Sequence, residues 1–153
     1  MKTFTAIVLA VSLLSMTAGS SHATDPFPIK VGQDRRIFED ATGKPFLLHG
    51  DTAWSLIAEL KREDVEVYLQ DRRKRGFNAI LVNLVEHQFS RHPPANAYGE
   101  KPFNGEAFVD LNPKYFDHAA WVIERAQQLG FVVLLAPAYL GVSGGDQGWF
   151  RDI

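Results

Sequence analysis

Polar and aromatic side chains follow short apolar runs at three places in the chain. The residues that carry them are Asp51, Trp54, Asn83, Glu86, His87, Tyr139 and Trp149. A carboxylate can accept hydrogen bonds from two neighbouring hydroxyl groups, and an exposed aromatic ring can stack on the face of a sugar as well as fill a core. These side chains are therefore the predicted substrate contacts.

Several of these groups also have a structural interpretation. Asp51 suits the cap of a following helix, Trp54 suits a core position, and Asn83 could close a backbone hydrogen bond at a strand end. Asp51 and Glu86 could also approach each other across adjacent strand ends as a catalytic pair. Binding of sugar hydroxyls is the favoured role for both carboxylates.

Metal and cofactor chemistry is not predicted. Glu86, His87 and His92 gather possible metal ligands in one segment, but their spacing fits no zinc pattern. The sequence contains no Gly-x-Ser-x-Gly elbow, phosphate loop or dinucleotide fingerprint. The stretch from Ser143 to Asp146 is expected to be a flexible loop and not a nucleotide motif.

The elements that must position these groups alternate between strands and helices. Residues 36–48 read as a hairpin around Asp40–Gly43, and its second arm, Phe46–Leu48, is the expected opening strand of the domain. Helices are predicted at 55–60, 62–75 and 112–130, and further strands at 77–85 and 131–140. A long irregular segment, 86–112, separates the second strand from the last helix.

The last helix is expected to bury one stripe of residues at helical spacing. The members of this stripe are Phe116, Ala119, Ala120, Ile123 and Ala126.

One sequence pattern occurs twice. Arg75-Gly-Phe-Asn-Ala-Ile-Leu and Leu129-Gly-Phe-Val-Val-Leu-Leu each join a helix end, a glycine, a phenylalanine and a buried strand. With the opening strand, this repeat predicts a β-α-β-α-β arrangement with parallel strands and right-handed crossovers. The polar and aromatic groups would then meet at the carboxyl ends of the strands, where α/β barrels bind their ligands.

The N-terminus predicts export. A lysine at position 2, an apolar core from Phe4 to Met16 and the small residues of Ser21-His22-Ala23 form a signal peptide, residues 1–23. The expected location is secreted or periplasmic, with no membrane association after cleavage. The chain has no cysteine and a net charge of −2, so neither a disulfide framework nor nucleic-acid binding is predicted.

The number of strands is too small for a finished domain. Three parallel strands leave an apolar edge unpaired, and a (β/α)8 barrel needs roughly 250 residues. The expected architecture is α/β: a β-hairpin followed by the N-terminal portion, about three βα units, of a (β/α)8 TIM barrel. A small three-stranded α/β domain is the alternative.

The segment from Phe38 to Leu56, FEDATGKPFLLHGDTAWSL, resembles the start of the apiosidase-like glycoside hydrolases. The likeness continues through Arg75-Gly-Phe-Asn78, Tyr115-Phe-Asp-His118 and Leu135-Ala-Pro137. The resemblance implies a TIM-barrel glycosidase that cleaves polysaccharides from plants or microbes by a retaining mechanism. It divides the chain into the signal peptide, a lead-in at 24–35 and a truncated glycoside-hydrolase-like domain at 36–153.

The resemblance carries over no catalytic residue. In barrels of this type the acid/base follows the fourth strand and the nucleophile lies near the seventh, so both are expected beyond Ile153. Many relatives carry an aspartate where this chain has Ala119 or Ala120. The partner expected from the resemblance is a polysaccharide or oligosaccharide. The alternatives are a non-catalytic carbohydrate-binding protein and a metal-dependent hydrolase.

Overall fold

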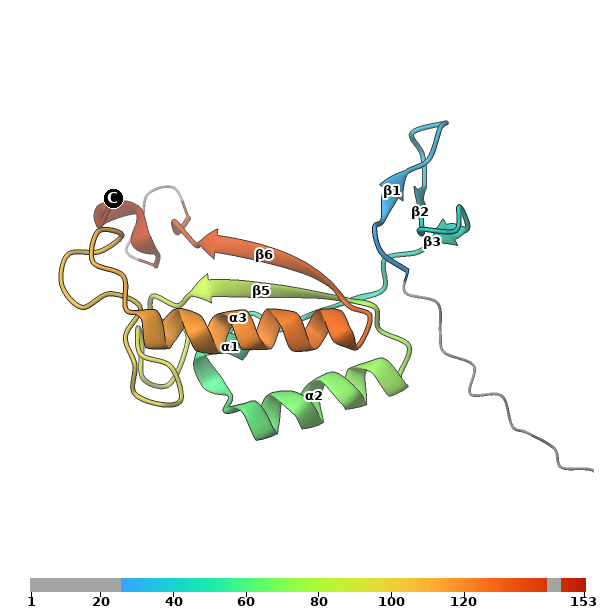
Figure 1. Cartoon of the computed structure of the whole chain (residues 1–153). Coiled ribbons are helices and arrows are strands. Elements are labelled where there is room, and N and C mark those ends of the chain that lie inside the picture. Colours follow the sequence, from blue (N-terminus) through green and yellow to red (C-terminus); the bar gives the residue numbers. More distant parts are fainter. Residues whose placement is uncertain (1–25, 143–146) are drawn as a thin grey trace, which may run out of the picture.

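The computed structural model describes residues 26–142 and 147–153 (Figure 1). The predicted signal peptide and the segment 143–146 lie outside the described residues. The elements are β1 (Lys30–Val31), β2 (Phe38–Glu39), β3 (Pro45–Phe46), β4 (Gly50–Thr52), α1 (Leu56–Glu59), α2 (Arg62–Lys74), β5 (Ala79–Val85), α3 (Pro113–Gln128), β6 (Val132–Ala138) and the 3-10 turn η1 (Trp149–Arg151).

The strands form two separate sheets. β1, β2 and β3 make a small antiparallel sheet, and its second pair is the predicted hairpin, with Phe38 opposite Phe46. β4, β5 and β6 lie side by side in chain order and run parallel. The predicted β-α-β-α-β arrangement is therefore confirmed for this sheet, while β1 adds a strand that the sequence did not indicate.

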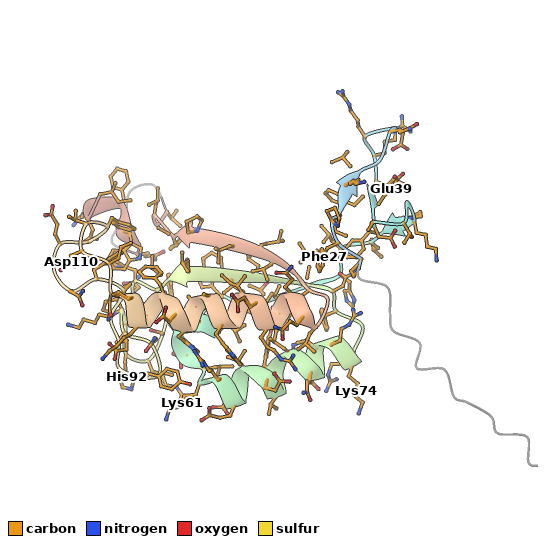
Figure 2. All side chains as sticks on the ribbon, in the orientation of Figure 1. Phe27, Glu39, Lys61, Lys74, His92 and Asp110 are labelled. Atoms are coloured by element: carbon orange, nitrogen blue, oxygen red, sulfur yellow. The ribbon has the colours of Figure 1, made fainter. Side chains whose placement is uncertain are left out.

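The helices pack on one side of the parallel sheet (Figure 1). Their apolar stripes and the facing strand residues form one core, and side chains fill the space between the layers (Figure 2). Its most deeply buried apolar members include Ile57, Val65, Leu69, Ile80, Val122 and Phe131. Among the described residues, no helix combines the length and apolarity needed to cross a membrane.

The repeated helix-to-strand connection has the same geometry both times. Gly76 and Gly130 have φ of +88° and +78°, a conformation that L side chains rarely adopt. The next residue in each case, Phe77 or Phe131, donates its N–H to a carbonyl five residues back, at 3.1 and 3.0 Å. This is the Schellman pattern, and it turns each helix directly into the following strand.

The opening strand lies later in the chain than predicted. The expected strand was Phe46–Leu48, but Phe46 belongs to β3 of the antiparallel sheet and Leu47 is 83% exposed. The side chain of Asn78 explains the shift, because it donates to the Leu47 carbonyl at 2.7 Å and accepts from the His49 N–H at 2.7 Å. This amide holds the crossing between the sheets, so that parallel pairing starts at Gly50.

The buried face of α3 also differs from the prediction. Ala119 and Ala126 are buried as expected, but Ala120 is exposed, and the remaining buried positions are Tyr115, His118 and Val122. Two of these carry polar tips that find backbone partners. The Tyr115 hydroxyl donates to the Leu84 carbonyl at 2.9 Å, and Nε2 of His118 lies 3.1 Å from the Leu60 carbonyl.

Strand β6 lies at one edge of the parallel sheet, as predicted for the third strand. Its middle residues Leu134 and Leu135 are 46% and 38% exposed and point to opposite faces. An exposed apolar edge strand is a template for pairing with another chain. We therefore expect the chain to self-associate in solution, and Leu134→Lys to reduce that association.

Sedimentation velocity over a range of concentrations measures this effect. Thr52→Lys, an exposed substitution on the opposite edge strand β4, is the control for added charge. A wild-type chain that stays monomeric at high concentration would contradict the expectation and favour a finished three-stranded domain.

The buried ring of His118 predicts a dependence of stability on pH. Burial lowers the pKa of His118 from its ordinary value of 6.5, so the unfolded chain binds more protons just below that pH. The free energy of unfolding should fall as the pH drops below about 6.5. His118→Gln, which keeps a donor for the Leu60 carbonyl, should show a smaller fall between pH 7.5 and pH 5 in urea titrations; an equal fall would show that other groups cause it.

Candidate functional site

The candidate site lies at the carboxyl ends of the parallel strands. β5 and β6 point the same way, toward the segment 86–112 and η1 (Figure 1). Trp54 follows β4, Glu86 and His87 follow β5, and Tyr139 follows β6. Because neighbouring parallel strands end at the same edge of a sheet, these residues gather there, as the sequence predicted.

Aromatic rings form a cluster at this edge. The rings of Trp54 and Tyr139 meet edge to face, with centroids 5.7 Å apart and planes at 78°. Phe89, which the sequence did not single out as a contact, packs its ring against Tyr139 at 5.8 Å and is 48% exposed. Since β5 lies between β4 and β6, contact between Trp54 and Tyr139 spans the end of β5.

Asn83 lies in β5 beneath this edge and is 2% exposed. Its backbone N–H donates to the Trp54 carbonyl at 2.8 Å. The structural alternative gave the Asn83 side chain a strand-end hydrogen bond, but here the main chain makes that bond. Among the described residues, neither its Oδ1 nor its Nδ2 has a hydrogen-bond partner. The amide therefore remains unpaired at the centre of the candidate site.

Glu86 is 1% exposed, and its carboxylate is occupied by the protein itself. The Ser55 hydroxyl donates to Oε2 at 2.7 Å, and the backbone N–H groups of His87 and Phe89 donate to Oε1 at 3.1 and 3.2 Å. Glu86 thus fixes the turn after β5 and links it to the residue that follows Trp54. This arrangement assigns Glu86 a positioning role, where the sequence predicted direct contact with substrate.

Asp51 lies apart from the cluster. Its carboxylate accepts hydrogen bonds from the Tyr68 hydroxyl at 2.8 Å and from Nε of Arg72, both on α2. Asp51 pairs in register with Ile80, so by strand alternation it faces the helices, opposite to Asn83. These two hydrogen bonds, called the bracket below, connect β4 to α2. The sequence had predicted contact between Asp51 and substrate.

The bracket shifts the pKa of both the Asp51 carboxyl and the Tyr68 hydroxyl. Burial raises the pKa of the Asp51 carboxyl, but the hydrogen bonds from Tyr68 and Arg72 outweigh it and hold that pKa below the ordinary value of 3.8. Burial, and then the hydrogen bond to Asp51, raise the pKa of Tyr68 to about 12. The carboxylate is therefore ionised over the whole neutral range.

Asp51 and Glu86 do not form a catalytic pair. The register partner of Asp51 is Ile80, and Glu86 follows Ile80 by six positions in the chain. At about 3.3 Å per residue, this places the carboxylates roughly 20 Å apart along the strand direction. Retaining glycosidases hold their two carboxyl groups about 5 Å apart.

His87 and Trp149 join the strand end to η1. Trp149 is 5% exposed and donates its Nε1–H to the Val85 carbonyl at 3.2 Å. It therefore packs in the core, whereas the sequence predicted that it contacts substrate. The His87 ring lies against it at 4.8 Å, with Nε2 3.5 Å from a carboxylate oxygen of Asp152. His87 therefore lies at the strand ends, beside the aromatic cluster.

Within the described ranges, no group of three or more His, Asp or Glu side chains is placed to hold a metal ion. The residues that the sequence did not reveal are Ser55, Tyr68, Arg72, Asn78 and Phe89. Tyr68 and Arg72 are four residues apart on α2, a spacing that points both side chains to one face and could have indicated a shared partner.

Comparison with known proteins identifies the family. The family described as "Apiosidase-like, catalytic domain" matches residues 32–152, and the chain belongs to it. No curated protein sequence matches the chain.

Solved structures place the chain among glycoside hydrolases. A structure described as a glycoside hydrolase shares 29% sequence identity with a TM-score of 0.60. A glycoside hydrolase family 5 protein from Bacteroides vulgatus ATCC 8482 shares 27% identity, also with a TM-score of 0.60. Each likeness covers 71% of this chain, which spans 24% of the length of each relative.

The bracket of Asp51 predicts a loss of stability on substitution. Asp51→Asn should lower the free energy of unfolding at pH 7 by about 1–3 kcal/mol, because it removes the charged acceptor shared by the Tyr68 hydroxyl and Arg72 Nε. The Asp51 carboxyl has a pKa below its ordinary value of 3.8 in the folded chain. Its contribution to stability is therefore present above that value and is lost as the pH falls through the folded pKa.

Urea titrations at pH 7 and pH 3 measure both effects, and the gap between wild type and Asp51→Asn should narrow at pH 3. Asp117→Asn, on the exposed face of α3, is the matched control. Equal stabilities of wild type and Asp51→Asn at pH 7 would show that the hydrogen bonds of Asp51 with α2 do not stabilise the fold.

Proposed function

We propose that this chain forms the first three βα units of a (β/α)8 glycosidase domain, which hydrolyses glycosidic bonds in polysaccharide from plants or microbes. The observation that carries the proposal is the cluster of Trp54, Asn83 and Tyr139 at the carboxyl ends of β4, β5 and β6. In α/β barrels this face holds the substrate. Membership of the apiosidase-like family and the likeness to glycoside hydrolases support the same reaction.

The chain supplies one wall of the substrate site under this proposal. A retaining mechanism needs one carboxyl that donates a proton and a second that attacks the sugar, about 5 Å apart. Asp51 is engaged by α2 and Glu86 by the turn after β5, so the acid/base and the nucleophile come from strands after β6. That the chain spans 24% of its structural relatives supports this division.

The rest of the proposal concerns location and cofactors. Export is proposed from the signal sequence predicted in residues 1–23. The proposed location is the periplasm or the outside of the cell, where polysaccharide is available. Hydrolysis by two carboxylates needs neither a metal nor an organic cofactor.

A non-catalytic carbohydrate-binding protein is the second candidate. One observation favours it: Asp51 and Glu86, the two carboxylates predicted to contact substrate, are both committed to structural hydrogen bonds. Such a protein would use the aromatic cluster and Asn83 to hold a glycan without cleaving it.

The protein encoded by the complete reading frame tests the proposal. Beyond Ile153 the frame is expected to encode a fourth strand that ends in an acidic residue. The purified protein should release reducing sugar from at least one polysaccharide in a panel of xylan, pectin, cellulose and bacterial glycans. Proton NMR should show that the anomeric configuration is retained, and EDTA should leave the rate unchanged.

Each other outcome excludes part of the proposal. Binding without release of sugar would establish the non-catalytic candidate, and inversion of the anomer would rule out the retaining mechanism. Loss of activity with EDTA, together with metal in stoichiometric amount, would indicate a metal-dependent hydrolase. Residues 24–153 produced alone should release no sugar.

A further inference from the structure

Asn83 is buried on the face of the parallel sheet that is opposite to α2. Strand alternation puts it on the same face as Leu81, whose register partners are Thr52 in β4 and Leu134 in β6. Thr52 is exposed and Leu134 is 46% exposed, whereas Asn83 is 2% exposed. The cover over this face is therefore local to the strand ends.

The aromatic pair of Trp54 and Tyr139 lies at the same strand ends. Trp54 lies in the turn after β4, and its carbonyl accepts the Asn83 N–H at 2.8 Å, so the backbones of the two residues adjoin. The ring of Tyr139 reaches Trp54 from the other side of β5, at 5.7 Å. The two rings thus meet at the carboxyl end of β5, next to the buried Asn83.

An unpaired amide in this position is unfavourable for folding. Burying an amide without hydrogen-bond partners destabilises the folded state, and a leucine of similar size would avoid that cost. The amide offers an acceptor at Oδ1 and donors at Nδ2. This pair matches two neighbouring hydroxyl groups of a sugar, while the indole of Trp54 offers an apolar surface to the sugar ring.

We propose that Asn83 and Trp54 form a covered sugar subsite, and that substrate opens it by displacing Tyr139 from the edge of Trp54. The sugar ring then stacks on Trp54, and two adjacent hydroxyls form hydrogen bonds with Oδ1 and Nδ2 of Asn83. This inference rests on the proposed carbohydrate substrate. It adds which residues hold one sugar unit and which residue closes over them when the subsite is empty.

Glu86 is the positioning residue of this subsite. Its carboxylate accepts the hydroxyl of Ser55, the neighbour of Trp54, and the N–H of Phe89, whose ring supports Tyr139. The buried Glu86 side chain therefore fixes both the turn that carries Trp54 and the position of Phe89, which packs against Tyr139. Glutamine can accept the His87 and Phe89 N–H groups at Oε1 and can donate from Nε2 to the Ser55 hydroxyl oxygen. Glu86→Gln should therefore retain sugar binding that Glu86→Ala loses.

Tryptophan fluorescence of the full chain, titrated separately with xylohexaose, cellohexaose and trigalacturonate, tests the subsite. At least one of these probes is expected to give a saturable change. For that probe, Asn83→Leu should weaken binding by about tenfold or more and also raise the urea midpoint, because the unpaired amide is gone. Tyr139→Ala should tighten binding several-fold, since no ring competes with the sugar for Trp54.

The matched control is Thr52→Val, an exposed substitution on the same sheet face that should leave the affinity unchanged. The inference is overturned if Asn83→Leu binds the probe as tightly as wild type, if Tyr139→Ala weakens binding, or if no probe binds either wild type or Tyr139→Ala. Failure of the proposed function is a separate result. If the complete protein binds a probe but does not hydrolyse it, the proposed glycosidase activity is refuted and the subsite stands. If it hydrolyses the probe and Asn83→Leu does not slow the reaction, only the subsite is refuted.

Discussion

The register of β4 against β5 is the constraint on which the candidate site depends. β4 has 3 residues, so its ladder of hydrogen bonds is short, yet a slip by one residue would turn every side chain to the opposite face. Asp51 would then leave α2, and the hydrogen bond from the Asn83 N–H to the Trp54 carbonyl would be lost. The Asn78 side chain, bonded to residues 47 and 49, fixes the start of β4, and the bracket from Asp51 to α2 fixes its middle.

The two acidic residues near the strand ends show how charge is used to build the site. Each carboxylate joins elements that are distant in the chain: Asp51 joins β4 to α2, and Glu86 joins the turn after β5 to Ser55. A buried carboxylate is stable only when hydrogen bonds compensate for its lost hydration, and both have such bonds. Among the described residues, the neutral amide of Asn83 has no hydrogen-bond partner. Together with the partly exposed rings at the same strand ends, it suits recognition of an uncharged, hydroxyl-rich ligand.

The parts of the fold that could be predicted are those that local sequence determines. Glycines at helix ends and continuous apolar runs defined α2, β5, α3 and β6 to within a few residues, and their repetition gave the parallel order. The opening strand was misplaced because a side-chain amide 29 residues away from His49 in the chain decides where pairing begins. The buried face of α3 was misread because Tyr115 and His118 count as polar until their backbone partners are known.

The candidate site divides in the same way. Strand order brought Trp54, Asn83 and Tyr139 to one edge, as the alternation of strands and helices implied. The depth of each residue could not be read from the chain, because it depends on contacts across elements. Trp149 is buried by its bond to the Val85 carbonyl, and Asp51 turns to the helices because Tyr68 and Arg72 are there to receive it.

The paired returns at Gly76 and Gly130 have a consequence for how such a protein can change over evolution. Both returns lie at the edge of the sheet away from the aromatic cluster, and both are determined within a few residues of backbone. The long segment 86–112, in contrast, leaves from the opposite edge. Insertions there can remodel what the protein recognises without touching the reversals that keep successive strands in step, so specificity and architecture can drift independently.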